Sequence, residues 1–369
     1  MKFNISRQIW FCTLAIIGFG LVALYSASYQ NSRVSDQVFY DQLYCAFFGV
    51  LLLFVVSKFD FRRYFDIAYP LYVVNLCLLI FVLLLGRHAM GAQRWIEIAG
   101  INFQPSEISK LALILALARY FSQRRPRLAF NFLSQTQSFI HDLLIPLGAT
   151  GIVMLFIFKQ PDLGTSLLMM GIFIVMIFAA DVDKRWIFGF LGVCCAIVPF
   201  SWSLLRSYQK DRLLVFLNPN IDPLGAGYTI IQSKIAIGSG GLIGKGWLSG
   251  SQNQLNFLPE RHTDFIFSVV GEEWGLVGSV CLIFLYFLLI WNGLTIADKI
   301  KDKFGKLLAV GVVSILALQV IINIGMVMGL FPIVGLTLPL MSYGRTSFVL
   351  FIVMVGILLN LSGKRTIFY

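Results

Sequence analysis

Ten long apolar segments divide the chain, and they constrain its fold more than any other feature of the sequence. The hydrocarbon core of a bilayer, about 30 Å thick, requires about 20 apolar residues per helix. A mean hydropathy of +0.82 and 34 phenylalanines exclude a single water-soluble core for 369 residues. We therefore predict an all-α, polytopic membrane helix bundle with about ten transmembrane helices, at residues 9–28, 39–57, 70–86, 106–121, 141–158, 163–180, 186–205, 264–292, 307–331 and 341–362.

Lysine and arginine are distributed unequally between the loops of this bundle. With the N-terminus inside, the inner loops and both ends hold sixteen of them, and the short outer loops hold Arg33, Arg87, Arg94 and Lys159. This bias predicts that both termini are cytoplasmic. Attraction to anionic lipid headgroups accounts for the formal net charge of +11, so we expect no nucleic-acid partner. The segment 206–263, between the seventh and eighth spans, is then a large extracytoplasmic loop.

The remaining organisation of the chain is simple. All six cysteines lie inside apolar segments without a C-x-x-C pair, so the sequence predicts neither a disulfide framework nor a metal site. The first apolar segment is longer than the apolar region of a signal peptide, and we expect it to remain as an uncleaved helix. No repeat or soluble linker interrupts the chain. We therefore expect residues 1–369 to form a single membrane domain.

The stretch GAGYTIIQSKIAIGSGGLIGKG, residues 225–246, is the most patterned part of the outer loop. Tyr228, Ile231 and Ile235 recur at helical spacing and predict a short interfacial helix. The glycines that follow do not match a nucleotide phosphate loop, because Ser239 and Gly246 stand at positions where that motif requires glycine and a hydroxyl residue. A flexible hinge or turn is favoured, with Lys245 as a candidate phosphate contact.

The stretch FQPSEISK, residues 103–110, places two charges in the fourth span. Glu107 and Lys110 are three residues apart and share one helix face. One interpretation is a lysine that extends toward the membrane surface beside a neutralising neighbour. The other is a partly buried ion pair that shapes an aqueous cavity, which is favoured because charges in spans are costly and usually face protein or water.

The stretch NFLPERHTDF, residues 256–265, places Glu260, Arg261, His262 and Asp264 at the outer end of the eighth span. The same topology brings Arg94, Asp162 and Arg212 to that face. Several cations beside a carboxylate suit an anionic substrate that is held in the membrane. Asp264 also has a purely structural interpretation, because a carboxylate that opens a helix is stabilised by the helix dipole by about 0.3–1 kcal/mol.

These motifs, together with GAQRWI, QPDLGT and GLTLPLMSYG, resemble the SEDS family (shape, elongation, division and sporulation), and most its rod-shape members. The resemblance covers essentially the whole chain, and residues 257–275 are its most specific part. One departure is the sequence SYGRTS, where Arg345 and Thr346 replace residues of a Gly-Gly-Ser-Ser pattern. The resemblance implies that Asp264 is catalytic and that Glu107 and Lys110 match the family's intramembrane Glu and Lys.

The resemblance further implies a peptidoglycan glycosyltransferase in the bacterial cytoplasmic (inner) membrane, with its active site facing the periplasm. Such an enzyme polymerises lipid II into β-1,4-linked glycan strands during cell elongation. It works with a class B penicillin-binding protein, a transpeptidase, and with the elongation machinery. The family provides no certain cofactor, and a divalent cation, Mg or Mn, is a candidate at the diphosphate.

Lipid II carries its sugar on an α-linked diphosphate, so formation of a β linkage inverts the anomeric centre in one displacement. One carboxylate then suffices as general base, and we expect Asp264 to fill this role. The candidate cations for the departing diphosphate are Arg94, Lys110, Arg212, Lys245 and Arg261. Two alternatives remain open: a flippase or transporter for lipid-linked precursors, and a scaffold that only recruits the penicillin-binding protein.

Overall fold

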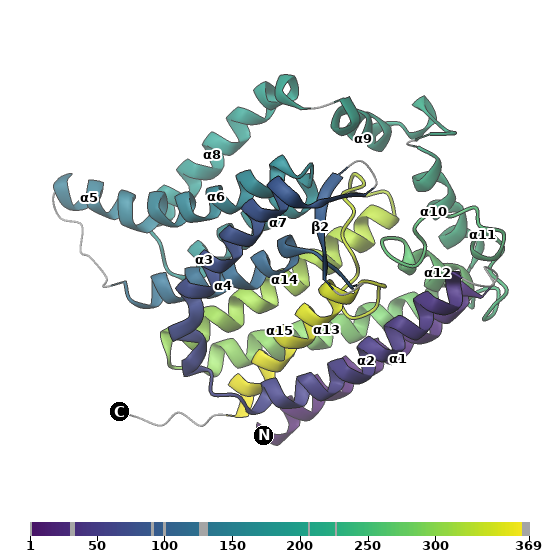
Figure 1. Cartoon of the computed structure of the whole chain (residues 1–369), viewed down its shortest axis with the longest axis horizontal. Helices are drawn as coiled ribbons and strands as arrows, with labels where there is room; N and C mark the ends of the chain where they lie inside the picture. The colour runs from purple at the N-terminus through teal and green to yellow at the C-terminus, as the bar shows by residue number, and fades with distance from the viewer. Residues whose placement is uncertain are drawn as a thin grey trace. The chain divides into compact units, whose positions relative to one another are not determined.

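A computed structural model describes residues 2–29, 34–89, 92–98, 101–124, 132–205, 207–225 and 227–363, and these are mostly helical (Figure 1). The α-helices are α1 (Lys2–Ser28), α2 (Val34–Lys58), α3 (Arg62–Leu85), α4 (Pro105–Ser122), α5 (Phe132–Phe139), α6 (Ile145–Lys159), α7 (Leu163–Ala179), α8 (Lys184–Ser201), α9 (Ser207–Leu217), α10 (Tyr228–Ser239), α11 (Ser251–Gln254), α12 (Ile266–Glu273), α13 (Gly275–Lys299), α14 (Lys303–Val327) and α15 (Arg345–Gly363). A π-helical segment, Ile140–Leu144, joins α5 to α6, and short 3-10 turns occupy Trp202–Leu204 and Pro219–Ile221.

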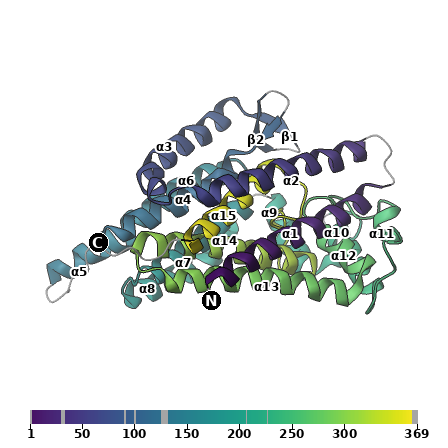
Figure 2. The same ribbon diagram turned by 90° about the horizontal axis from the view of Figure 1, so that it is seen from below.

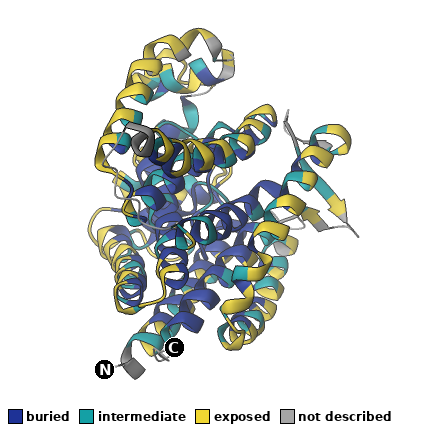
Figure 3. Cartoon of the chain, turned by 90° about the vertical axis from the view of Figure 1, so that its left-hand side faces the viewer, coloured by how far each residue is buried: buried dark blue, intermediate teal, exposed yellow. Residues whose placement is uncertain are grey.

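Every predicted span overlaps at least one helix, and the prediction of a polytopic helical membrane protein is confirmed. Within the described residues, seven helices are long and apolar enough to cross a bilayer. The three other predicted spans correspond to α4, α7 and α8, of which α7 is a shorter apolar helix of 17 residues. On several helices, buried residues lie on one face and exposed residues on the opposite face (Figure 3), whereas α4 is buried along most of its length. Large apolar side chains such as Phe47, Phe54 and Leu84 are more than half exposed, as expected for surfaces that face lipid.

The residues cluster into two compact units. The first comprises residues 1–54, 201–292 and 316–353, and the second comprises residues 55–200, 293–315 and 354–369. The unit boundaries fall inside α2, α8, α13, α14 and α15. That residues 1–369 form one domain stays a prediction.

A small antiparallel sheet in the second unit is a structure that the all-α prediction missed. Strands β1 (Arg87–Ala89), β2 (Ala92–Ile98) and β3 (Ile101–Phe103) follow α3 in the chain (Figure 2). Ile96 pairs with Phe103, Glu97 with Asn102, and Ile98 with Ile101. Apolar and polar residues alternate in the paired segments Ile96–Ile98 and Ile101–Phe103, and that alternation is the signal from which the hairpin could have been predicted.

The predicted eighth span, residues 264–292, is a broken helix. Helix α12 ends at Glu273 and α13 starts at Gly275, which has a φ of +62°. The glycine-rich loop that follows α10 pairs with this break through backbone hydrogen bonds. The amides of Lys245 and Gly246 each donate to the carbonyls of Glu272 and Glu273, respectively, at 3.0 Å. The amides of Leu276 and Val277 donate to Gly241 and Leu242, at 2.9 and 3.1 Å. The glycines therefore form an ordered turn that satisfies the backbone at the helix break.

The short helix predicted in this stretch is confirmed as α10, whereas its position in the membrane interface stays a prediction. The residues that it buries are not the three that predicted it. Ile230, Ser233 and Ala236 are buried, whereas Ile235 is 44% exposed. Helix α10 packs against α12, and the two lie together in both ribbon views (Figures 1 and 2). Small side chains on the contact face let the two backbones approach closely, which hydrophobic spacing alone did not predict.

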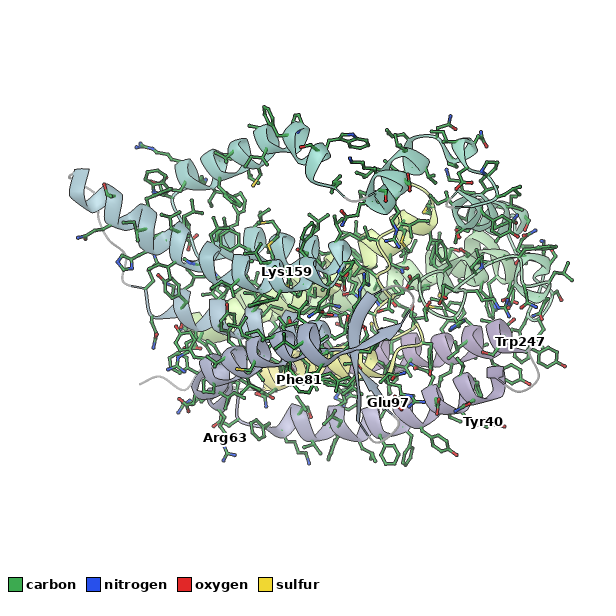
Figure 4. The ribbon with its side chains drawn as sticks, turned by 45° about the horizontal axis from the view of Figure 1, so that its top comes forward. Tyr40, Arg63, Phe81, Glu97, Lys159 and Trp247 are labelled. Atoms are coloured by element: carbon green, nitrogen blue, oxygen red, sulfur yellow. The ribbon has the colours of Figure 1, made fainter. Side chains whose placement is uncertain are left out.

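Aromatic side chains gather where α1, α2 and the glycine-rich loop meet. The ring of Tyr25 lies 5.8 Å from that of Trp247 and 5.2 Å from that of Phe39, and Phe39 lies 5.7 Å from Tyr40. Tyr40 and Trp247 project from this end of the first unit (Figure 4). Aromatic residues are enriched where helices meet the membrane–water interface, so this cluster suits one membrane surface.

The close approach of Gly244 to the helix break generates a stability prediction. Gly244 has a φ of +90°, and a Cβ atom there would lie 2.2 Å from the carbonyl oxygen of Glu273. We expect Gly244→Ala to destabilise the protein by at least about 1–3 kcal/mol, since alanine is strained at this φ and the backbone must shift. Gly238 in α10 has no atom within 4 Å of its Cβ position and is the matched control. Gly238→Ala should be neutral or slightly stabilising. Equal thermal unfolding of the two variants in detergent would show that the pairing is unimportant.

Candidate functional site

The segment before α12 forms consecutive turns that expose some charges and bury others. Glu260 is exposed with a φ of +50°, and its carbonyl accepts hydrogen bonds from the amides of Thr263 at 3.1 Å and Phe265 at 3.3 Å. Helix α12 begins at Ile266, with Phe265 as its N-cap. The expectation that Asp264 opens the helix is therefore wrong, because the turn at Glu260 delays the helix start. Asp264 lies before the N-cap and is partly buried.

Asp264 faces a second irregular segment, residues 328–344, which joins α14 to α15 without helix or strand. Gly335 in this loop has a φ of +69°, and a Cβ atom there would lie 3.5 Å from Oδ2 of Asp264. The side-chain amide of Asn323 in α14 donates to the carbonyl of Asp264 at 2.9 Å and to that of Leu336 at 2.6 Å. The two irregular segments are thus joined at the predicted catalytic residue.

Other side chains hold the backbone of residues 328–344. Arg212 Nη1 donates to the carbonyl of Ile333 at 3.2 Å, and Gln319 Nε2 donates to that of Thr337 at 2.9 Å. The hydroxyl of Tyr286 donates to the carbonyl of Pro339 at 2.6 Å. A backbone bond adds to these, from the amide of Tyr343 to the carbonyl of His262 at 2.9 Å. Irregular backbone in a membrane protein requires such internal partners. Arg212, an exposed predicted cation, therefore contacts the same loop as Asp264.

Arg261 and His262 have different surroundings from Glu260. Arg261 is buried, and its Nε donates to the carbonyl of Ala27 in α1 at 2.7 Å. Burial lowers the pKa of Arg261. Burial also lowers the pKa of His262. The charge of Arg261 lowers this pKa further, whereas the charge of Glu260 raises it. The His262 ring, 6.0 Å from that of Tyr343, is therefore biased toward its neutral form. Arg261 joins the turn to α1.

Lys245 is an exposed residue whose ammonium group pairs with a buried carboxylate. Its Nζ lies 2.8 Å from Oε1 of Glu272 and 2.9 Å from Oγ of Ser251. Glu272 is fully buried and also accepts from the amides of Gln252 at 2.9 Å and Asn253 at 3.2 Å. This arrangement ties the glycine-rich loop to the start of α11, so it supports a structural role for Lys245.

Glu107 and Lys110 form an ion pair in the second unit. Lys110 Nζ lies 2.7 Å from Oε1 of Glu107, and the two side chains are 0% and 9% exposed, respectively. A lysine that reached water would be exposed, so the structure favours the buried ion pair over the surface-directed interpretation. One position before Lys110 on the helix, Ser109 exchanges hydrogen bonds with Asn75 of α3, at 2.7 and 3.0 Å. Helices α3 and α4 are therefore joined beside the pair.

Arg94 and Asp162 also lie together in the second unit. Arg94 Nε donates to the carbonyl of Gln160 at 2.8 Å, and a second guanidinium nitrogen donates to that of Pro161. Asp162 lies 3.9 Å from the Arg94 guanidinium and accepts from the amide of Thr165 at 3.1 Å, which caps α7. These bonds join β2 to the turn between α6 and α7. Substrate contacts by either residue stay a prediction.

Arg345, one of the two residues at which the sequence departs from the family pattern, pairs with another helix. Arg345 forms an ion pair with Asp41 of α2, and each of these side chains is about one quarter exposed. Gln42 beside Asp41 contacts the backbone of Ser342 and Gly344, each at 3.5 Å. The start of α15 is therefore joined to α2 by polar side chains.

Sequence reasoning missed the residues that hold Asp264 in place. Gln319 and Asn323 are polar, four residues apart and fully buried in an apolar span. Polar residues inside a span usually mark functional positions, and this was the signal available. Among the described residues, no group of three or more His, Cys, Asp or Glu side chains could hold a metal ion. We therefore derive no chemistry through a divalent cation.

The buried pair generates a prediction about folding. Removing either Glu107 or Lys110 leaves the other charge uncompensated, which costs about 3–5 kcal/mol for a buried pair. We expect each Ala substitution to lower the yield of folded protein and its melting temperature, with the double variant no worse than the worse single variant. Glu97→Ala and Lys159→Ala, at exposed positions of the same unit (Figure 4), are the controls and should have little effect. Small, additive losses for Glu107→Ala and Lys110→Ala would contradict the pairing.

The comparisons with known proteins agree with one another. The family model of FtsW, RodA and SpoVE, described as a cell cycle protein, matches residues 6–367. The peptidoglycan glycosyltransferase MrdB of Escherichia coli K12 is 39% identical over 373 residues, which cover 99% of this chain and 95% of that protein. A solved structure described as "Structural coordination of polymerization and crosslinking by a peptidoglycan synthase complex" aligns with a TM-score of 0.81 and 36% identity over 97% of both chains. The rod shape determining protein RodA of Thermus thermophilus aligns with a TM-score of 0.70 and 31% identity, over 97% of this chain and 96% of that one. The chain belongs to the SEDS family, which includes FtsW, RodA and SpoVE.

Proposed function

We propose that the chain is a peptidoglycan glycosyltransferase that polymerises lipid II into β-1,4-linked glycan strands during cell elongation. The observation that carries this proposal is the position of Asp264. Its carboxylate lies against Gly335, and Asn323 fixes its backbone to the loop 328–344. A carboxylate held in this way just before α12 suits a reaction on a substrate that is anchored in the membrane. The names of the relatives support the same class of reaction.

Asp264 acts as the general base in this proposal. The acceptor's 4-hydroxyl group loses its proton to the Asp264 carboxylate as its oxygen attacks the anomeric carbon of the donor. The bond from that carbon to the diphosphate breaks in the same step, so the α linkage becomes β and undecaprenyl diphosphate leaves. A diphosphate is a good leaving group, so it requires cations rather than a proton donor.

Arg212 is the cation that the contacts favour most for the diphosphate. It is exposed and bonds to Ile333, two residues from Gly335, so it belongs to the same loop as Asp264. Arg261 is buried and bonded to α1, and Lys245 is paired with Glu272, so both suit structural roles. Lys110 is paired with Glu107 in the second unit. That this pair takes part in substrate binding is a proposal that rests on the family resemblance alone.

We place both termini in the cytoplasm and Asp264 at the periplasmic face of the inner membrane, on the distribution of Lys and Arg. We also propose that a class B penicillin-binding protein crosslinks the strands that this chain makes. The solved relative whose description joins polymerization to crosslinking supports such a partner.

The orientation predicts which side of the membrane reaches each loop. Leu224 is 89% exposed in the proposed outer loop, and Lys301 is exposed in the proposed inner loop between α13 and α14. A membrane-impermeant thiol reagent should label Leu224→Cys in intact spheroplasts, and it should label Lys301→Cys only after lysis. The parent protein, with its six cysteines in spans, gives the background. The reverse pattern would invert the topology and exclude a periplasmic site.

Replacement of Asp264 separates catalysis from binding. Asp264→Asn keeps the side-chain size but cannot accept the proton, so polymerisation of purified lipid II should fall by about 10² or more. The variant should still fold and bind lipid II. Gel analysis of glycan length measures the reaction, and Glu260→Gln is the control at the neighbouring exposed carboxylate. Near-normal synthesis by Asp264→Asn would reject Asp264 as the base. If the parent protein transports lipid II but makes no polymer, the result would favour a flippase.

A further inference from the structure

One side chain bonds to both irregular segments at the proposed active site. Asn323 is 0% exposed on α14, and its amide nitrogen donates to the carbonyls of Asp264 and Leu336 at 2.9 and 2.6 Å. These two carbonyls belong to residues that are 72 positions apart in the chain. Gly335, the neighbour of Leu336, is the residue whose Cβ position lies 3.5 Å from the Asp264 carboxylate. The amide therefore fixes the two backbones whose approach defines the surroundings of that carboxylate.

Gln319 extends the same face of α14 by one helical turn. It is also 0% exposed, and its amide nitrogen donates to the carbonyl of Thr337 at 2.9 Å and to the hydroxyl of Thr337 at 3.3 Å. Residues four apart lie on one helix face, so the two amides hold consecutive residues of the loop. Gln319 reaches only the loop in these bonds, whereas Asn323 reaches both the loop and Asp264. Asn323 thus bonds directly to the backbone of the proposed base.

We propose that Asn323 is a positioning residue that holds Asp264 and the loop at Gly335 in the geometry needed for proton abstraction. This inference rests on the proposed role of Asp264 as the base. The primary amide suits the task because its nitrogen carries two N–H donors, one for each carbonyl. An aspartate has the same shape but offers two acceptor oxygens when ionised and a single donor when protonated. It cannot satisfy both carbonyls, and a misplacement of about 1 Å at a catalytic group can cost about 10²-fold in rate.

The test compares Asn323→Asp with Asn292→Asp in the lipid II polymerisation assay. Asn292 is a buried asparagine of α13 whose amide donates to the carbonyl of Leu288 in its own helix at 2.8 Å. We expect Asn323→Asp to lower kcat by about 10–10²-fold with KM changed less than about threefold, because the substrate contacts remain and the base is displaced. Asn292→Asp should retain the parent kcat. Asn323→Gln keeps the two donors on a longer side chain, and its kcat should lie between those of Asn323→Asp and the parent.

The combination with Asp264→Asn separates positioning from a general effect on folding. If Asn323 acts through Asp264, adding Asn323→Asp to Asp264→Asn should change the residual kcat by less than about twofold, because residues that act as a unit are not additive. The melting temperature should nevertheless fall by as much as it does in the single variant. A full additional loss of activity in the double variant would overturn the proposal, as would a parent-like kcat for Asn323→Asp.

Two further outcomes are informative. If Asn323→Asp does not give folded protein, Asn323→Gln carries the same kcat, KM and double-variant measurements. A rise in KM at unchanged kcat for that variant would overturn positioning and assign Asn323 to substrate binding. If Asp264→Asn alone retains normal activity, the proposed function of Asp264 fails independently of any result at Asn323.

Discussion

Two irregular segments, residues 255–265 and 328–344, are partly buried. Their buried backbone polar groups must find partners within the protein, and the candidate site depends on how they do so. An unsatisfied amide or carbonyl costs several kcal/mol in a hydrocarbon environment. Side chains of α14 supply the bonds: Asn323 reaches Asp264 and Leu336, and Gln319 reaches Thr337. Since these bonds fix both segments, the position of the Asp264 carboxylate follows from the packing of apolar helices that carry a few buried amides.

A second set of bonds uses charges and glycines for structure. The glycine-rich loop pairs its backbone with the break between α12 and α13, and the buried Glu272 joins Lys245 to the start of α11. A buried carboxylate is tolerated only when it is paired and hydrogen-bonded. Lys245, which the sequence offered as a phosphate contact, is therefore better explained as the counter-ion of Glu272. Arg212 differs because it bonds to the loop that faces Asp264.

Hydrophobic segment length and helical periodicity predicted the features that depend on local sequence. The positions of the helices agree with the ten apolar segments, and the spacing of Glu107 and Lys110 correctly predicted that they share a helix face and form a pair. The charges of NFLPERHTDF predicted a site for an anionic substrate at this segment, and the family resemblance singled out Asp264 within it. That the residue is catalytic stays a proposal.

The features that the sequence did not reveal depend on contacts between distant segments. The sheet at residues 87–103 was missed because membrane-helix patterns dominated its surroundings, although its alternating residues carried a signal. The break at Gly275 depends on backbone pairing with a loop about 30 residues earlier, which periodicity does not encode. The role of Asn323 depends on two carbonyls that are far apart in the chain.

A cryo-electron microscopy structure of the Asp264→Asn protein with bound lipid II would test the account most directly. The account predicts a sugar hydroxyl about 2.6–3.2 Å from the side chain of residue 264. Lipid II bound with no sugar near residue 264 would contradict it.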